Sequence, residues 1–251
     1  MQNYPAEVTW WVNELQQDDN FEINSFPFVV FGVILLLTSS LFFNGGSVDS
    51  MFNSEQNAPK IIMCTIISAA TAGLSSAFLK PLINGTYTRT RRYDVLALCN
   101  GVLAGLVSIT GVCDHCEPWC AFFIGLIGSL QYSLACKLWK KLGVDDPIEA
   151  SQVHGACGIW GLIAVGIFDN EKGLIFHDAD DNFIFMGVQL CGLISILAWT
   201  VALTLPYFLI MKKLKLLRVP LINEIVGLDV AEMGSTAHID YLIGQSIYRA
   251  H

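Results

Sequence analysis

His154 is the residue of this chain whose type and setting could do chemistry. It lies in the run IEASQVHGACGIWGLIAVGIF, which has no charged residue after Glu149. A membrane-spanning helix built from this run would place His154 deep in the bilayer, where an ionisable side chain is either hydrogen-bonded between packed helices or part of a solute or proton path. Burial opposes the charged form, and a neutral imidazole both donates and accepts a hydrogen bond. His154 could therefore hold a small polar molecule or relay a proton, and simple packing remains the alternative.

A second group of reactive residues forms the short segment CDHCEPWC. Its candidate ligands and redox groups are Cys113, Asp114, His115, Cys116, Glu117 and Cys120. Such residues can bind zinc, but a second CxxC motif is missing from the sequence. In an oxidising compartment a disulfide fits the segment at least as well as a metal site, and ordinary loop cysteines are the third and simplest interpretation.

The sequence shows no pattern typical of an enzyme. The apolar runs contain no HExxH motif, no Ser/His arrangement and no pair of carboxylates. We therefore expect no catalytic residues, no cofactor and no resident metal ion. The net charge of -8 comes from the loops and the acidic N-terminal segment and gives no reason to expect a nucleic-acid partner.

Long apolar runs must position these residues. Of the 251 residues, 53% are hydrophobic and 14% charged, and the mean hydropathy is +0.53. Six runs carry few or no charges: 26–43, 61–83, 95–112, 120–138, 151–168 and 183–211. They approach or exceed the roughly 20 residues that cross a hydrocarbon layer, and they lack the period-two alternation of barrel strands. The expected fold class is all-α, a polytopic membrane bundle of about six transmembrane helices.

The positions of basic residues predict the orientation. They gather after the second, fourth and sixth runs: Lys80, Arg89, Arg91 and Arg92; Lys137, Lys140 and Lys141; Lys212, Lys213, Lys215 and Arg218. By the positive-inside rule, the C-terminal tail is cytoplasmic and the first run crosses from inside to outside. The expected organisation is an acidic cytoplasmic segment (1–25), a six-helix transmembrane part (26–211) and a cytoplasmic tail (212–251).

Small residues recur at helical spacing within several runs. They are Ala69, Ala72, Gly73 and Ser76; Gly101 and Gly105; Gly125 and Ser129; Gly155, Gly158 and Gly161. In a membrane such residues let helix backbones approach closely, because van der Waals packing replaces the hydrophobic driving force. The pattern predicts a tightly packed bundle and by itself no function.

Four stretches resemble motifs of the ammonium transporter family, in the family's order. FFNGGS at 42–47 is similar to its FNxGS motif, and NGVLAGLVSITGVCD at 100–114 to the next signature span. VDDPIEASQVHGACGIWGLIAVGIF at 144–168 resembles the penultimate span, an acidic-acidic-Pro turn followed by a VHGxCGxxG helix. EIVGLDVAEMG at 224–234 resembles the opening of the cytoplasmic regulatory tail.

The resemblance implies a role for each matching residue. His154 matches one of a pair of pore histidines, which hydrogen-bonds ammonia or ammonium and can pass on a proton. Phe43 matches one of two stacked phenylalanines that close the pore from outside, and Ser47 resembles a hydroxyl that helps to recruit the ammonium ion. The turn before the pore helix, which Asp145 is expected to cap, comprises Asp145, Asp146 and Pro147. The matching residues of the regulatory tail are Gly227, Leu228, Asp229 and Gly234.

The chain has fewer runs than the family has spans. Family members have about eleven spans, in two five-helix repeats of inverted topology plus a final helix. The six runs look like the second repeat and the final helix, so the resemblance implies that the partner histidine and the other gate phenylalanine are missing. We expect transport of ammonium or ammonia through a hydrophobic pore that a first half completes, the chain being a fragment or incomplete gene model. The alternative is a truncated, non-transporting subunit that associates with full-length transporters and regulates them.

The expected partners follow from the same resemblance. They are ammonium or ammonia, the lipid bilayer of the plasma membrane and, in an intact family member, two further copies in a homotrimer.

Overall fold

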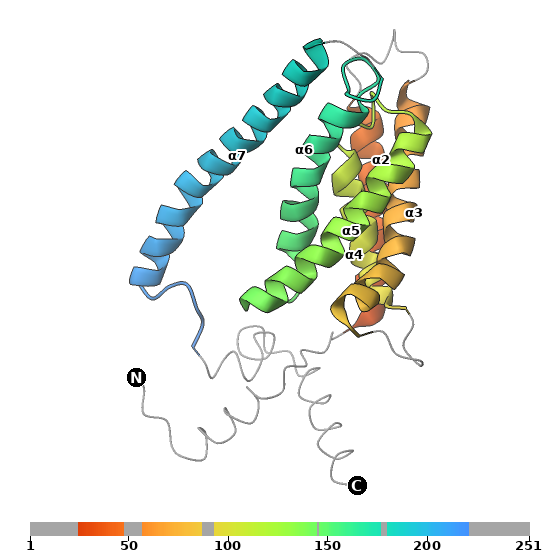
Figure 1. Cartoon of the computed structure of the whole chain (residues 1–251). Coiled ribbons are helices and arrows are strands. Elements are labelled where there is room, and N and C mark those ends of the chain that lie inside the picture. The colour runs from red at the N-terminus through yellow and green to blue at the C-terminus, as the bar shows by residue number, and fades with distance from the viewer. Residues whose placement is uncertain (1–24, 48–56, 87–92, 145, 177–179, 221–251) are drawn as a thin grey trace, which may run out of the picture. The chain divides into compact units, whose positions relative to one another are not determined.

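The computed structural model describes residues 25–47, 57–86, 93–144, 146–176 and 180–220. All regular structure in these ranges is helical, which confirms the all-α class (Figure 1). The helices are α2 (Phe26–Gly46), α3 (Asn57–Asn84), α4 (Val95–Ile109), α5 (Pro118–Leu142), the π-helical segment η1 (Ser151–Ala156), α6 (Cys157–Phe168) and α7 (Asp180–Lys213). The chain divides into two compact units, Ile23–Leu197 and a second made of Met1–Glu22 with Ala198–His251.

Each of the six apolar runs is helical in the structure. Within the described ranges, five helices are long and apolar enough to cross a membrane. The helix α4 has 15 residues, which gives a length of about 22 Å at 1.5 Å per residue. The expectation that this helix reaches residue 112 is wrong, because tight i→i+3 turns follow Ile109: Val112 N–H donates to Ile109 O at 3.0 Å and His115 N–H to Val112 O at 3.1 Å.

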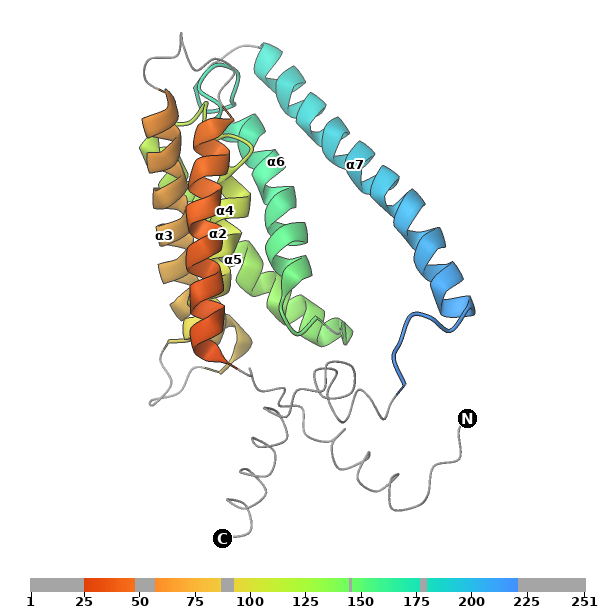
Figure 2. The same cartoon turned by 180° about the vertical axis from the view of Figure 1, so that it is seen from behind.

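The centre of the first unit is the packing of α3 against α4 and α5 (Figure 2). A Cβ atom added at Gly125 would lie 2.4 Å from the carbonyl oxygen of Ser68, and one at Gly105 would lie 2.5 Å from the same oxygen. Both contacts are far below van der Waals distance, so only glycine lets α4 and α5 approach α3 here. The prediction of close backbone packing is confirmed at these positions.

The small-residue pattern of the fifth run divides between two environments. A Cβ at Gly161 would meet the carbonyl oxygen of Ser108 at 3.2 Å, as expected for a packed helix. A Cβ at Gly155 would meet no atom within 4 Å. The packing expectation is therefore wrong for Gly155, because it lies on a side of η1 that the described bundle leaves open.

Short-range signals fix the starts and ends of the helices around the site. Asp94 caps α4 by accepting hydrogen bonds from the N–H groups of Leu96 at 3.0 Å and Ala97 at 3.1 Å. The helix α5 starts at Pro118 and ends at Leu142, and the capping residue Gly143 has a left-handed φ of 66°. Such φ values cost glycine little, so the chain can reverse before the acidic turn.

The described part of the second unit is the stretch 198–220. It contains the C-terminal part of α7, which ends with Lys212 and Lys213 in its last turn. Two cations at this end complement the negative end of the helix dipole. The segments expected at 1–25 and 212–251 fall largely outside the described residues and stay predictions.

Candidate functional site

His154 lies in the π-helical segment η1, which continues directly into α6. Such segments are rare and often mark functional sites. The side chain of His154 is exposed, whereas Gln152 and Val153 are buried on the side of η1 that packs against α4 and α5. The imidazole is exposed in the chain by itself, on the side where the family resemblance leads us to expect the missing first half. His154 and Gly155 share a side of the segment with open space in front of it.

Hydrogen bonds of neighbouring residues show at which level along α5 His154 lies. Gln131 Nε2 donates to the carbonyl oxygen of Ala156 at 3.1 Å, and Cys157 Sγ donates to that of Gly128 at 3.6 Å. Gln131 lies about halfway along α5. His154 is therefore close to the mid-level of α5 although it is only four residues into its own helical segment, which agrees with a position deep in the bilayer.

The acidic turn holds the start of this segment. Asp146 accepts hydrogen bonds from the N–H groups of Ala150 at 3.0 Å and Ser151 at 2.8 Å, and from the Ser151 hydroxyl. Partial burial alone would raise the pKa of Asp146, but these hydrogen bonds outweigh it and lower the pKa. Asp145, expected to be the cap, lies outside the described residues. Its neighbour Asp146 performs that capping, directly before Pro147.

A buried ionic cluster anchors the same turn to three helices. The Glu149 carboxylate accepts hydrogen bonds from Lys80 Nζ of α3 at 2.6 and 2.8 Å and from Asn100 Nδ2 of α4 at 2.8 Å. It also accepts one from the hydroxyl of Tyr132 of α5. Lys80 also donates to the Tyr132 hydroxyl at 3.1 Å. Lys80 is 9% exposed and Tyr132 is fully buried. We call these four residues the inner cluster, and they tie η1 to every helix of the central packing.

The backbone of Glu149 is unusual for its residue type. Its φ is 59°, a left-handed value that non-glycine residues rarely adopt. Burial would raise the pKa of its carboxyl, but the charge of Lys80 and the hydrogen bonds from Lys80, Tyr132 and Asn100 lower it. The carboxylate stays charged, and its partners hold the strained turn in place.

Sequence reasoning missed the inner cluster. Two signals were present: Lys80 is a charge near the end of an apolar run, and Glu149 is the last charge before His154. Neither signal names its partner, because the two residues are 69 positions apart and only the packing of α3 against the turn brings them together.

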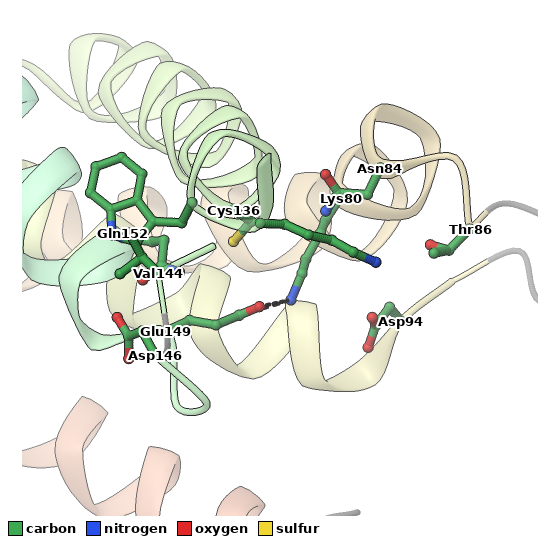
Figure 3. Close-up of a pocket in the computed structure, with 11 residues that line it drawn as sticks. Lys80, Asn84, Thr86, Asp94, Cys136, Val144, Asp146, Glu149 and Gln152 are labelled. Carbon is green, nitrogen blue, oxygen red and sulfur yellow. Dashed lines mark hydrogen bonds and ion pairs between the residues drawn. The ribbon is translucent and has the colours of Figure 1, made fainter. Parts of the chain in front are cut away.

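A cavity of about 330 Å³ opens beside the inner cluster (Figure 3). Figure 3 shows the Lys80–Glu149 ion pair at its wall. The lining residues are Lys80, Asn84, Thr86, Asp94, Cys136, Trp139, Lys140, Val144, Asp146, Glu149 and Gln152. The lining combines three carboxyl groups and two ammonium groups with the apolar surface of Cys136, Trp139 and Val144, so the cavity is of mixed polar and apolar character.

Phe43 and Ser47 lie toward the end of α3 that is opposite the inner cluster. Asn44, between them, donates from Nδ2 to Thr65 Oγ1 of α3 at 3.1 Å. Thr65 precedes Lys80 by 15 helical positions, which is about 22 Å along the axis. The Phe43 ring is 66% exposed, and the Ser47 hydroxyl donates to the Phe43 carbonyl at 2.6 Å. Among the described residues, no hydrogen bond or ion pair joins Phe43 or Ser47 to His154.

A second ion pair closes the end of the bundle near Phe43. Lys60 Nζ lies 2.7 Å from Glu117 Oε1, and Asn170 Nδ2 donates to the same oxygen at 3.0 Å. The hydrogen bond from Lys60 is the main cause of the lowered pKa of Glu117. These three residues, called the outer cluster, join α3, the start of α5 and the loop after α6.

The cysteines of the CDHCEPWC segment are buried and free. Cys113, Cys116 and Cys120 carry no disulfide, and the described residues contain no group of three or more ligands that could hold a metal ion. The side chain of His115 is 45% exposed and lies 3.4 Å from Asp114. The described geometry gives no support to the zinc interpretation.

Comparison with known proteins gives the class to which this fold and site belong. The profile described as Ammonium Transporter Family matches residues 11–238. The chain belongs to that family. The four positions expected in a regulatory tail, Gly227, Leu228, Asp229 and Gly234, fall within the match but outside the described structure.

Individual relatives agree with the family assignment. Ammonium transporter 1 member 1 of Arabidopsis thaliana is 34% identical over 236 residues, which cover 86% of this chain and 46% of the plant protein. Ammonium transporter Amt2 of Archaeoglobus fulgidus is 33% identical, covering 87% and 47%.

Solved structures show the same relation. Saccharomyces cerevisiae Mep2 has a TM-score of 0.65 at 31% identity, covering 76% of this chain and 45% of its own. A structure described as a sensor Amt protein has a TM-score of 0.69 at 33% identity, covering 81% and 48%. The chain thus spans about half the length of the relatives it matches.

Proposed function

We propose that this chain supplies one half of an ammonium-conducting pore and that His154 lines that pore. The supporting observation is the placement of His154, exposed beside the open position of Gly155 and near the mid-level of α5. A second half, equivalent to the first repeat of the family, covers this side and supplies the partner histidine.

The chemistry of an imidazole suits this position. A charge at the bilayer centre costs at least about 2.5 to 3.5 kcal/mol on insertion scales, so ammonium crosses most easily after leaving a proton behind. A neutral imidazole accepts a hydrogen bond from ammonia and donates one to it. Sodium and potassium have no proton to leave and no hydrogen bond to donate, which gives selectivity.

The far end of the bundle supplies the entrance. The exposed Phe43 ring can attract a cation through its π face, and the Ser47 hydroxyl can accept a hydrogen bond from ammonium. In the orientation given by the positive-inside rule, both face outside and the inner cluster with its cavity faces the cytoplasm. Asp146 and Glu149 set the start of η1 and thereby the position of His154.

The setting of the complete pore is proposed from the family. The chain resides in the plasma membrane as a multi-pass protein with a cytoplasmic C-terminus, assembles as a homotrimer and carries regulatory contacts on its tail. It has no catalytic role.

A second role is favoured by the open side of η1, where a Cβ at Gly155 would meet no atom within 4 Å. A chain with an open side could associate with full-length ammonium transporters and regulate them without conducting. The two roles differ in what the chain does to ammonium uptake when another transporter is present.

Uptake in cells that lack ammonium transporters tests both roles. We expect the chain to restore ¹⁵N-ammonium uptake when it is co-expressed with the first repeat of a family member, His154→Ala to reduce that uptake at least tenfold, and His115→Ala, in the opposite loop, to leave it unchanged. Equal uptake by wild type and His154→Ala would contradict the pore role.

Co-expression with a full-length ammonium transporter completes the test. A chain that gives no uptake even with the first repeat, but changes the uptake of its full-length companion, supports the regulatory role. A chain that gives no uptake with the first repeat and has no effect on its companion contradicts both proposals.

A further inference from the structure

Four cysteines from three parts of the chain gather at the end of the bundle that holds the outer cluster. Cys64 comes from α3, Cys113 and Cys116 from the loop after α4, and Cys120 from the first turn of α5. All four belong to one buried apolar cluster. The sequence placed only the last three together, and the fold adds Cys64.

Cys64 and Cys116 are the pair in contact. Both are fully buried, and Cys64 Sγ lies 3.7 Å from the carbonyl oxygen of Cys116. Both side chains also belong to the same buried apolar cluster. Cys113 Sγ has a different partner, the carbonyl of Thr110 at 3.5 Å.

We propose that Cys64 and Cys116, whose thiols are reduced in this structure, form a disulfide in the mature protein that fastens the loop after α4 to α3. Each thiol loses one hydrogen and one S–S bond forms. The two electrons and two protons pass to the disulfide of a thiol-disulfide exchange catalyst, which is released as a dithiol. Because both thiols are sealed from solvent in the folded chain, the bond forms while the chain folds in an oxidising compartment.

The proposed cross-link has a mechanical consequence. The loop after α4 has no regular helix, and it carries Glu117 of the outer cluster into contact with Lys60 of α3. A bond from Cys64 to Cys116 would close the whole α3–α4 hairpin covalently and stabilise the folded state by restricting the unfolded chain. The inference rests on the proposed orientation, which puts this loop on the oxidising side of the membrane.

Thiol counting on the purified full chain tests the bond. The protein is denatured in acid, alkylated with and without prior reduction, and weighed intact. We expect all eight cysteines to react after reduction and two fewer without it. Peptic peptides should contain the Cys64–Cys116 link, and reduction should lower the unfolding temperature by on the order of 5 °C.

Serine variants identify the pair. Cys64→Ser and Cys116→Ser should each abolish the link and the effect of reductant on the unfolding temperature, while Cys99→Ser, a buried thiol elsewhere on α4, should retain both. A link that survives in Cys64→Ser would show that the pairing is wrong.

A C-terminal fluorescent or alkaline phosphatase fusion reports orientation separately. With the tail inside and the loop outside, alkylation of all eight cysteines without reductant overturns the disulfide. With the tail outside, the orientation fails, and a Cys64–Cys116 link would then be absent because the loop faces a reducing compartment.

Discussion

The two ion pairs on α3 use the same chemistry in different surroundings. At the inner cluster, the side chains of Lys80 and Glu149 are 11% and 18% exposed, and two further donors reach the same carboxylate. At the outer cluster, those of Lys60 and Glu117 are 31% and 42% exposed. A buried pair is costly to break because the remaining charge has no water, whereas an exposed pair exchanges its partner for solvent.

Because the two clusters differ in burial, we expect them to contribute differently to stability and to the position of His154. The inner cluster holds a strained glutamate five residues before His154, so it determines where the proposed pore segment begins. The outer cluster closes a loop whose position other contacts also fix. We therefore expect substitutions at the inner cluster to affect stability and His154, and those at the outer cluster to have small local effects.

The largest expected effect is that of Lys80→Met. This change leaves the Glu149 carboxylate buried without its cation and should reduce the free energy of unfolding by about 3–5 kcal/mol, measured by denaturant titration in detergent micelles. The double variant Lys80→Met/Glu149→Gln should recover most of this loss. If Lys80→Met lowered the free energy of unfolding no more than Lys60→Met does, the inner cluster would not be the more stabilising of the two.

Acid should weaken the inner cluster in a defined direction. The pKa of Glu149 lies below its ordinary value of 4.5 in the folded chain. Its contribution is therefore complete above pH 4.5 and is lost as the pH falls through the lowered pKa. Unfolding temperatures from pH 7 to pH 3 should fall less steeply for Glu149→Gln than for wild type, and parallel curves would argue against a charged Glu149.

Tyr132→Phe should have an intermediate effect. It removes one donor to Glu149 while Lys80 and Asn100 remain, so we expect a loss of about 1–3 kcal/mol in the free energy of unfolding. Tyr207→Phe, an exposed residue of α7, is the matched control and should change nothing. An equal effect of both would mean that the Tyr132 hydroxyl contributes no stability.

Glu117→Gln should have the smallest effect. The amide can still accept the hydrogen bond from Asn170, and the exposed ion pair is worth about 1 kcal/mol or less. The same denaturant titration, repeated at high salt, should show little further change. A loss above 2 kcal/mol would place the outer cluster on a level with the inner one.

The sequence predicted the helices, but it did not predict the contacts between residues far apart along the chain. Six apolar runs predicted six helices because in lipid the backbone must satisfy its own hydrogen bonds. The end of α4 at Ile109 was missed because hydropathy continues to Val112 while the backbone already turns. The Lys80–Glu149 pair and the approach of Cys64 to Cys116 were missed because each joins residues more than 50 positions apart.

The same limit applies to the candidate site. Motif resemblance pointed to His154, and its mid-level position next to α5 could be anticipated from the uncharged run around it. Its exposure follows from the missing first half that the resemblance implied, whereas the periodic small residues wrongly predicted packing on a side where Gly155 meets nothing. A local pattern shows that a helix face can pack closely but does not identify the surface that covers it.

Photo-crosslinking from position 155 tests the central claim most directly, namely that a second protein surface covers the side of η1 that carries His154. A photoreactive phenylalanine analogue at Gly155, where no atom lies within 4 Å, is incorporated into the full chain in its native membrane and illuminated. The account predicts a protein adduct whose peptides come from an ammonium transporter chain. Adducts with lipid alone would contradict it.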